Sequence, residues 1–130
     1  RYFEVQPTHE YFWVKPSLPK NCVNGLSNPV ESIYVWQRAP FNGPDVTGMS
    51  NGNYSAVRYD QIEGIQFSAM QKPESLMRWL IELHTQPGDV IWDICAGTGT
   101  TLIAGDKLGR VMFGIEKDTE MIALYESRSR

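Results

Sequence analysis

Along the C-terminal part of the chain, continuous apolar runs alternate with apolar residues at helical spacing. Val90–Ile94 and Val111–Ile115 are short runs of the kind that form buried strands of a parallel sheet. Apolar stripes at helical spacing precede, separate and follow these runs. The order from 89 to 128 is therefore strand, helix, strand, helix. We expect the two strands to be parallel neighbours joined by a right-handed crossover.

Local residues mark where the helices begin and end. Pro73 opens the first helix, because a missing N–H costs nothing in the first turn. The second helix runs from Thr100 to Leu108, and Gly109 is a good residue to follow a helix. Asp118 or Thr119 can cap the last helix. This part of the chain is predicted to be an α/β unit.

The N-terminal part has a different pattern. His9–Lys15 and Ser32–Gln37 are dense in aromatic and β-branched residues, which predicts two strands. A long connection joins them, so we expect an antiparallel pair. Residues Ala39–Ser68 are rich in Gly, Pro and Asn without a helical period, which predicts a loop insertion. Within a compact domain a loop of this length is usually functional or disordered.

Composition limits the class of protein. The chain has 130 residues, 42% hydrophobic and 21% charged, which suits one domain. The net charge of −3 gives no general attraction to nucleic acid, although a basic face remains compatible with it. Cys22 and Cys95 show no metal spacing and favour a reducing, intracellular setting, with Cys95 expected to be a buried thiol. No apolar run is long enough to span a membrane.

The residues between the first parallel strand and its helix form a candidate ligand site. Ala96-Gly97-Thr98-Gly99 has small side chains, and the two glycines allow unusual backbone angles and close ligand approach. A helix N-terminus directly after the turn offers free backbone N–H groups. Glu116 ends the next strand about 20 residues later, where a nucleotide-binding βαβ unit places an acid for ribose hydroxyls.

Simpler interpretations remain open for each of these residues. Gly97 and Gly99 can form a purely structural turn, and Glu116 can be an exposed carboxylate at a strand end. Asp93 can cap turn amides or face the cationic part of a ligand. The turn lacks the third glycine of the full dinucleotide pattern, which argues against a nicotinamide-dependent oxidoreductase. No metal site is predicted.

Three segments together resemble the C-terminal portion of the S-adenosylmethionine-dependent DNA amino-methyltransferases. These are Gln71-Lys72-Pro73 with its helix, Asp93 to Thr101, and Gly114-Ile115-Glu116. The resemblance is to the β-type motif order, in which the catalytic motif comes first and the cofactor turn near the end. It is strong over 67–128 and weaker in the two N-terminal strands.

The resemblance implies roles for individual residues. Gln71, Lys72 and Pro73 would lie beside the methionine end of the cofactor, and Glu116 would bind the ribose hydroxyls. The turn that holds the methionine moiety would comprise Asp93, Cys95, Ala96, Gly97, Thr98, Gly99, Thr100 and Thr101. Ile94 and Cys95 depart from the usual Pro and Phe of that turn, which leaves the packing around the cofactor open.

The family's catalytic D/N/S-P-P-Y/F/W motif is absent from these 130 residues, so no catalytic residue is predicted here. The chain also starts without Met. We therefore expect it to be a portion of a methyltransferase whose N-terminal catalytic segment lies in the same or another chain. A non-catalytic remnant, or methylation of RNA, protein or a small molecule, are the alternatives.

The resulting prediction is a partial Rossmann-like methyltransferase fold over residues 1–130. Its mixed sheet would have a parallel βαβ unit at the C-terminal end and an antiparallel strand pair at the N-terminal end. The implied function is methyl transfer from S-adenosylmethionine to adenine N6 or cytosine N4 of double-stranded DNA, in a prokaryotic or phage-like cytoplasm. Residues 39–68 would be the target-recognition segment. The candidate DNA contacts are Lys20, Arg38, Tyr54, Arg58 and Tyr59.

Overall fold

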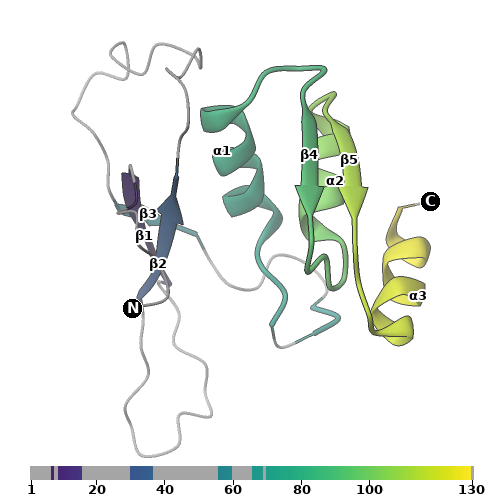
Figure 1. Ribbon diagram of the computed structural model, residues 1–130. Coiled ribbons are helices and arrows are strands. Elements are labelled where there is room, and N and C mark those ends of the chain that lie inside the picture. Colours follow the sequence, from purple (N-terminus) through teal and green to yellow (C-terminus); the bar gives the residue numbers. More distant parts are fainter. Residues whose placement is uncertain are drawn as a thin grey trace, which may run out of the picture. The chain divides into compact units, whose positions relative to one another are not determined.

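The computed structural model describes residues 7, 9–15, 30–36, 56–59, 66–68 and 70–129. The chain divides into two compact units, Arg1–Asp60 and Gln61–Arg130. Figure 1 shows the strands of the first unit and the alternating strands and helices of the second. Within the described residues no helix is long and apolar enough to cross a membrane.

The first unit holds a three-stranded sheet in the order β2-β1-β3. Strand β1 (His9–Val14) pairs antiparallel with β2 (Val30–Val35), as the aromatic and β-branched pattern predicted. Strand β3 (Ala56–Arg58) pairs parallel with β1. The prediction of a loop throughout residues 39–68 is therefore wrong at these three positions. Because β3 forms only with a distant partner strand, its short local pattern did not reveal it.

Trp13 is the centre of packing in this sheet. Its side chain is 1% exposed, and its indole Nε1–H donates a hydrogen bond of 2.8 Å to the Tyr59 carbonyl. Lys15 forms an ion pair with Glu31 and lies 4.9 Å from the centre of the Trp13 ring. A buried indole needs such a partner for its N–H, so this bond fixes the segment after β3 against β1.

The second unit begins with α1 (Glu74–His84) and continues as β4 (Val90–Asp93), α2 (Thr100–Lys107), β5 (Val111–Gly114) and α3 (Thr119–Arg128). Strands β4 and β5 are parallel neighbours, as predicted, with Val90 opposite Val111. In Figure 1 helix α2 lies behind the two strands. It packs against both of them, and α1 packs against α2.

Helix ends follow the residue types predicted for them. Gly109 adopts a φ of +74° after α2, and the N–H groups of Gly109 and Arg110 donate to the carbonyls of Asp106 and Gly105. This is the Schellman arrangement that ends helices at a left-handed glycine. Asp118 caps α3 by accepting the Glu120 N–H at 2.9 Å. Pro73 was predicted in the first turn of α1 and instead takes the N-cap position, one residue earlier.

Two glycines bring α2 close to β5. A Cβ at Gly105 would lie 2.0 Å from the Met112 Sδ, and a Cβ at Gly114 would lie 2.5 Å from the Leu102 Cδ1. Close helix–strand packing is the role that a third glycine plays in dinucleotide-binding units. Here that contact is made by glycines elsewhere in the unit.

The two faces of the β4–β5 sheet differ in burial. On the α2 side, Leu102 and Ala104 are buried. On the other side, Trp92 and Phe113 stack with ring centres 4.6 Å apart, yet remain 61% and 44% exposed. The remaining exposed apolar residues of this open face are Val90, Ile94, Val111 and Ile115. The prediction of buried strands is wrong for this face, whose apolar side chains are exposed, because α2 packs against the opposite face through Leu102 and Gly105.

Candidate functional site

The turn between β4 and α2 has the backbone that its glycines allow. Gly97 and Gly99 have φ angles of +54° and +75°, which side-chain-bearing residues rarely adopt. The Gly99 N–H closes the turn by donating to the Ala96 carbonyl at 2.8 Å. Gly99 also occupies the N-cap of α2, where no side chain caps the helix. The first turn of α2 therefore presents its positive dipole end without a side-chain cap.

Glu116 meets this turn from the end of β5. Its Oε2 accepts the Gly97 N–H at 2.7 Å, and its Oε1 accepts the N–H groups of Lys117 and Asp118 at 2.8 and 3.0 Å. The Ala96 N–H also donates to the Ile115 carbonyl at 3.0 Å. The predicted parallel pairing of the two strands thus brings the turn and this carboxylate together.

These contacts also set the charge of Glu116. The backbone N–H groups of Asp118 and Gly97 hold the pKa of its carboxyl below the usual value of 4.5. Hydrogen bonds from backbone donors stabilise the ionised form. The carboxylate is therefore negatively charged at neutral pH while it is tied to the turn.

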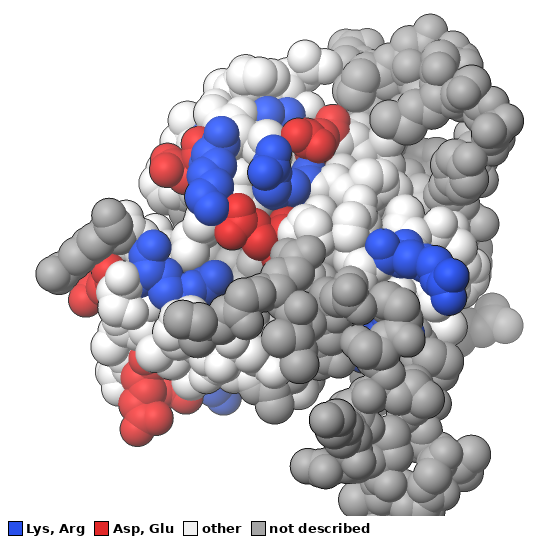
Figure 2. Space-filling model, turned by 180° about the vertical axis from the view of Figure 1, so that it is seen from behind, with Lys and Arg blue, Asp and Glu red and all other residues white. Residues whose placement is uncertain are grey.

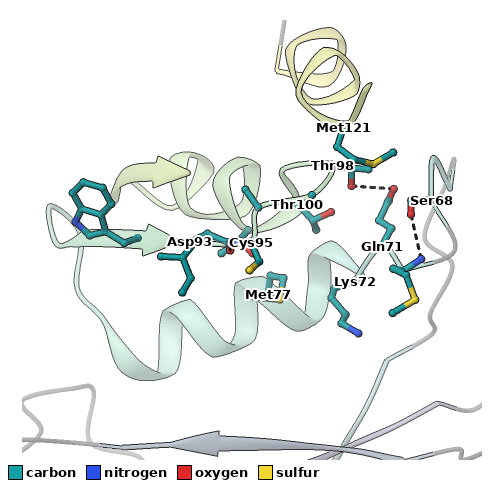
Figure 3. A pocket seen from close by; sticks show the side chains of 15 residues that line it. Ser68, Gln71, Lys72, Met77, Asp93, Cys95, Thr98, Thr100 and Met121 are labelled. Carbon is teal, nitrogen blue, oxygen red and sulfur yellow. Dashed lines mark hydrogen bonds between the residues drawn. The ribbon is translucent and has the colours of Figure 1, made fainter. Parts of the chain in front are cut away.

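A cavity of about 480 Å³ lies in front of the turn. Its lining comes from the segment before α1, Met77 of α1, the end of β4 with the glycine turn, the start of α2, and Met121 of α3 (Figure 3). The predicted cofactor residues in its lining are Gln71, Lys72, Asp93, Cys95, Ala96, Gly97, Thr98, Thr100 and Thr101. Pro73 and Gly99 are buried outside the lining, and Glu116 adjoins it through Gly97.

Gln71 links the segment before α1 to the glycine turn. Its Oε1 accepts the Thr98 hydroxyl at 3.3 Å and the Phe67 N–H at 3.1 Å. In Figure 3 Gln71 points toward Thr98, whereas Lys72 points the opposite way. The segment and the turn, 27 residues apart in sequence, are thereby joined at one wall of the cavity.

Asp93 and Cys95 correspond only partly to the expectations from the sequence. The Asp93 Oδ1 accepts the Cys95 N–H at 3.1 Å, which is the turn-capping role. Asp93 also lines the cavity, so its carboxylate can still contact the cationic part of a ligand there. The Cys95 thiol is free and exposed, and the prediction of a buried thiol is wrong. Cys95 follows the end of β4 and lies in the lining of the open cavity, which accounts for its exposure.

Sequence reasoning missed the contribution of α3 to this site. Arg128 donates to the Thr98 carbonyl and Tyr125 packs against Gly99, while Met121 lines the cavity. These three residues follow i, i+4, i+7 spacing and share one face of the helix. The sequence feature that could have revealed this contribution is the position of Arg128 on the same face of α3 as the apolar residues of that helix.

The candidate DNA contacts lie in the first unit. Lys20, Arg38 and Tyr54 fall outside the described residues. Arg58 is exposed on β3, and Tyr59 is half-buried with its carbonyl bonded to Trp13. Figure 2 shows basic side chains beside acidic ones over much of the face in view, rather than one continuous basic strip among the described residues there.

Comparison with known proteins places the chain in a family. The family model described as DNA methylase, of the N6/N4 class, matches residues 3–127. The type II methyltransferases M.HinfI and M.HindIII of Haemophilus influenzae are 41% and 42% identical to it over 68 and 80 residues. These alignments cover 52% and 62% of this chain, but 19% and 26% of the relatives.

Solved structures agree on the fold. The M1.HpyAVI–SAM complex superposes with a TM-score of 0.71 at 26% identity, over 94% of this chain and 61% of that chain. The cytosine-N4-specific PvuII DNA methyltransferase gives a TM-score of 0.75 at 18% identity, over 95% of this chain and 51% of that chain. The Rossmann-like methyltransferase fold predicted from the sequence is thus confirmed, and the chain spans about half the length of these structures. With most of its length matched by the family model, the chain belongs to the N6/N4 DNA methylases.

Proposed function

We propose that the glycine turn, Glu116 and the Gln71 segment bind S-adenosylmethionine, and that the complete protein transfers its methyl group to an exocyclic amino group in DNA. The observation that carries this proposal is the hydrogen bond between the Glu116 carboxylate and the Gly97 N–H at 2.7 Å. It places an ionised acceptor beside the turn, at the end of parallel strands where nucleotides bind. The likeness to M1.HpyAVI, whose structure was solved as a complex with SAM, supports the choice of cofactor.

The residues present suit this cofactor chemically. A Cβ at Gly97 would meet no heavy atom within 4 Å, so the glycine leaves open space beside the turn. Oε2 of Glu116 accepts one protein N–H, which leaves acceptor capacity for a ribose hydroxyl. Apolar side chains in the cavity lining offer contact for an adenine ring and a thioether chain. They include Met70, Met77, Trp92, Ile94 and Met121.

The proposed reaction is an in-line displacement. The amino nitrogen of the base forms a bond to the methyl carbon as the carbon–sulfur bond breaks. The electron pair of the broken bond stays on sulfur. The nitrogen then loses a proton, leaving the methylated base and S-adenosylhomocysteine. These residues would hold the methyl donor in position, which is a large part of catalysis in such a transfer. A flipped-out base would be gripped by the D/N/S-P-P-Y/F/W motif, which this sequence lacks.

Residues 39–68 are proposed to read the target, with double-stranded DNA as the partner and a cytoplasmic location. Exposed Arg58 on β3 supports this assignment, because a guanidinium there is free to reach a phosphate. In a protein that contains these residues and the catalytic motif, Arg58→Ala and Lys20→Ala should weaken DNA binding and flatten its salt dependence. DNA binding as strong as wild type in both variants would indicate that residues 39–68 are a linker and do not contact the target.

Equilibrium dialysis of the chain against methyl-labelled S-adenosylmethionine tests the cofactor assignment. We expect label to be retained at about one molecule per chain and displaced by S-adenosylhomocysteine, but not by NAD. Equal displacement by NAD, or no retention, would contradict the proposal. Added DNA should gain no label from this chain alone, because the base-gripping motif is missing.

A further inference from the structure

Helix α3 packs against the glycine turn through one face. A Cβ built at Gly99 would lie 2.1 Å from the Tyr125 Cδ2, so the tyrosine ring closes directly over the turn backbone. One turn further along α3, Arg128 reaches the same segment. The helix that follows β5 is therefore in contact with the backbone that is proposed to hold the cofactor.

Arg128 makes several contacts at this point. Its Nη1 donates to the Thr98 carbonyl at 2.5 Å and lies 3.5 Å from the Thr100 hydroxyl. Its guanidinium carbon lies 5.2 Å from the centre of the Phe67 ring. Burial lowers the pKa of Arg128, whereas Glu74 raises it. The guanidinium nevertheless stays protonated and able to donate, because its ordinary pKa is far above neutral.

Thr98 is consequently held from two directions. The Gln71 Oε1 accepts a hydrogen bond from the Thr98 hydroxyl on the cavity side, and the Arg128 guanidinium donates one to the Thr98 carbonyl. Arg128 itself lies outside the lining of the main cavity and lines a smaller one of about 240 Å³ next to it. Thr98 is 5% exposed, so its carbonyl has little access to water as an alternative partner.

We propose that Arg128 is a positioning residue for the methyl donor: its guanidinium fixes the Thr98 peptide and so holds the glycine turn in its binding conformation. This inference rests on the proposed cofactor site. A turn with two left-handed glycines has many accessible conformations. Each population of a conformation that does not bind the cofactor lowers the apparent affinity of the protein for it. Fixing the peptide between the two glycines removes most of that freedom.

The test compares two arginines that both donate to backbone carbonyls. Arg110 donates to the carbonyls of Thr85 and Leu108 at 2.8 and 2.6 Å, between the ends of α1 and α2 and outside the cavity lining. Arg128→Met and Arg110→Met each remove the donors but keep an apolar stem. S-adenosylhomocysteine affinity is measured by calorimetry, and folding by thermal unfolding.

We expect Arg128→Met to weaken S-adenosylhomocysteine binding about tenfold, because one or two part-buried hydrogen bonds are lost. Arg128→Lys should recover part of the affinity, because an ammonium can donate to the Thr98 carbonyl but lacks the planar fork. Arg110→Met should lower the melting temperature at least as much, with affinity within about twofold of wild type. A role in folding alone would not separate the two variants in this way.

Wild-type affinity in a folded Arg128→Met protein would overturn the inference. Should that variant fail to fold, Arg128→Gln provides the same test with a polar side chain that is too short for the contact, and unchanged affinity there would have the same meaning. A wild-type chain that binds no S-adenosylhomocysteine would instead overturn the cofactor site itself. Equal losses of affinity in the Arg110 and Arg128 variants would assign both residues to general stability.

Discussion

The two faces of the β4–β5 sheet have similar sequence character but different surroundings. On one face Met112 and Gly114 contact α2, whose Leu102 is 7% exposed. On the other, Trp92 and Ile94 are 61% and 71% exposed. The apolar residues of a strand therefore indicate only that both of its faces can be buried. Whether each side is buried depends on which helices are available to cover it.

The first prediction tests whether the α2 face holds the unit together. Leu102→Ala should destabilise the chain by about 3 kcal/mol, because it removes a buried side chain and leaves a cavity against Gly114. The matched change on the open face, Val111→Ala, should cost less than about 1 kcal/mol, since Val111 is 47% exposed. Urea unfolding followed by circular dichroism measures both. Equal costs would mean that the open face is covered in solution.

A second prediction concerns the open face directly. Trp92→Ser removes an exposed indole and its stacking on Phe113, so we expect less binding of an apolar dye and less self-association. The change in unfolding free energy should stay within about 1 kcal/mol. Dye fluorescence and sedimentation velocity supply the measurements. Unchanged dye binding in Trp92→Ser and Phe113→Ser alike would argue against an accessible apolar face.

A smaller effect is expected at the ion pair that joins α1 to α2. Lys107 Nζ lies 2.7 Å from the Glu74 Oε1, and the Lys107 side chain is 56% exposed. Lys107→Ala should therefore cost only about 0.5 kcal/mol, and less in high salt. The control is Lys117→Ala, which removes an exposed lysine between β5 and α3. A cost as large as that of Leu102→Ala would show that charge, not apolar burial, holds the helices together.

The smallest expected effect is the pH dependence of stability that Glu116 contributes. This residue lies just after the end of β5, at the edge shared by the two faces of the sheet. Because its pKa is lowered in the folded chain, its contribution to stability is present above the unfolded pKa and is lost as pH falls through the folded value. Glu116→Gln should remove this acid-side dependence and leave the neutral-to-alkaline profile unchanged. Melting temperatures between pH 3 and 7 would show it. Parallel profiles for the two proteins would contradict the contacts with Gly97 and Asp118.

Much of the second unit could be predicted from its sequence because its signals are local. A glycine at 109 and an aspartate at 118 mark helix ends through their own backbone and side-chain chemistry. The meeting of Glu116 with Gly97 followed from strand order, since parallel neighbours end at one edge. These features require no knowledge of distant side chains.

The features that sequence reasoning missed depend on contacts between distant segments. Strand β3 is three residues long and exists through its pairing with β1. Arg128 reaches the Thr98 carbonyl across 30 residues of sequence, and its position on the apolar face of α3 does not by itself identify that partner. The open face was mispredicted for the same reason, because coverage is a property of the assembly of elements rather than of a strand.

Calorimetric titration with S-adenosylhomocysteine measures whether Glu116 helps to bind the methyl donor. The wild-type chain should bind one molecule, and Glu116→Ala should weaken binding by about 10- to 100-fold, because a hydrogen bond to a charged group is lost. Glu120→Ala, an exposed acid in the first turn of α3, should bind as the wild type does. Affinity in Glu116→Ala equal to that of wild type would mean that this carboxylate does not bind the cofactor.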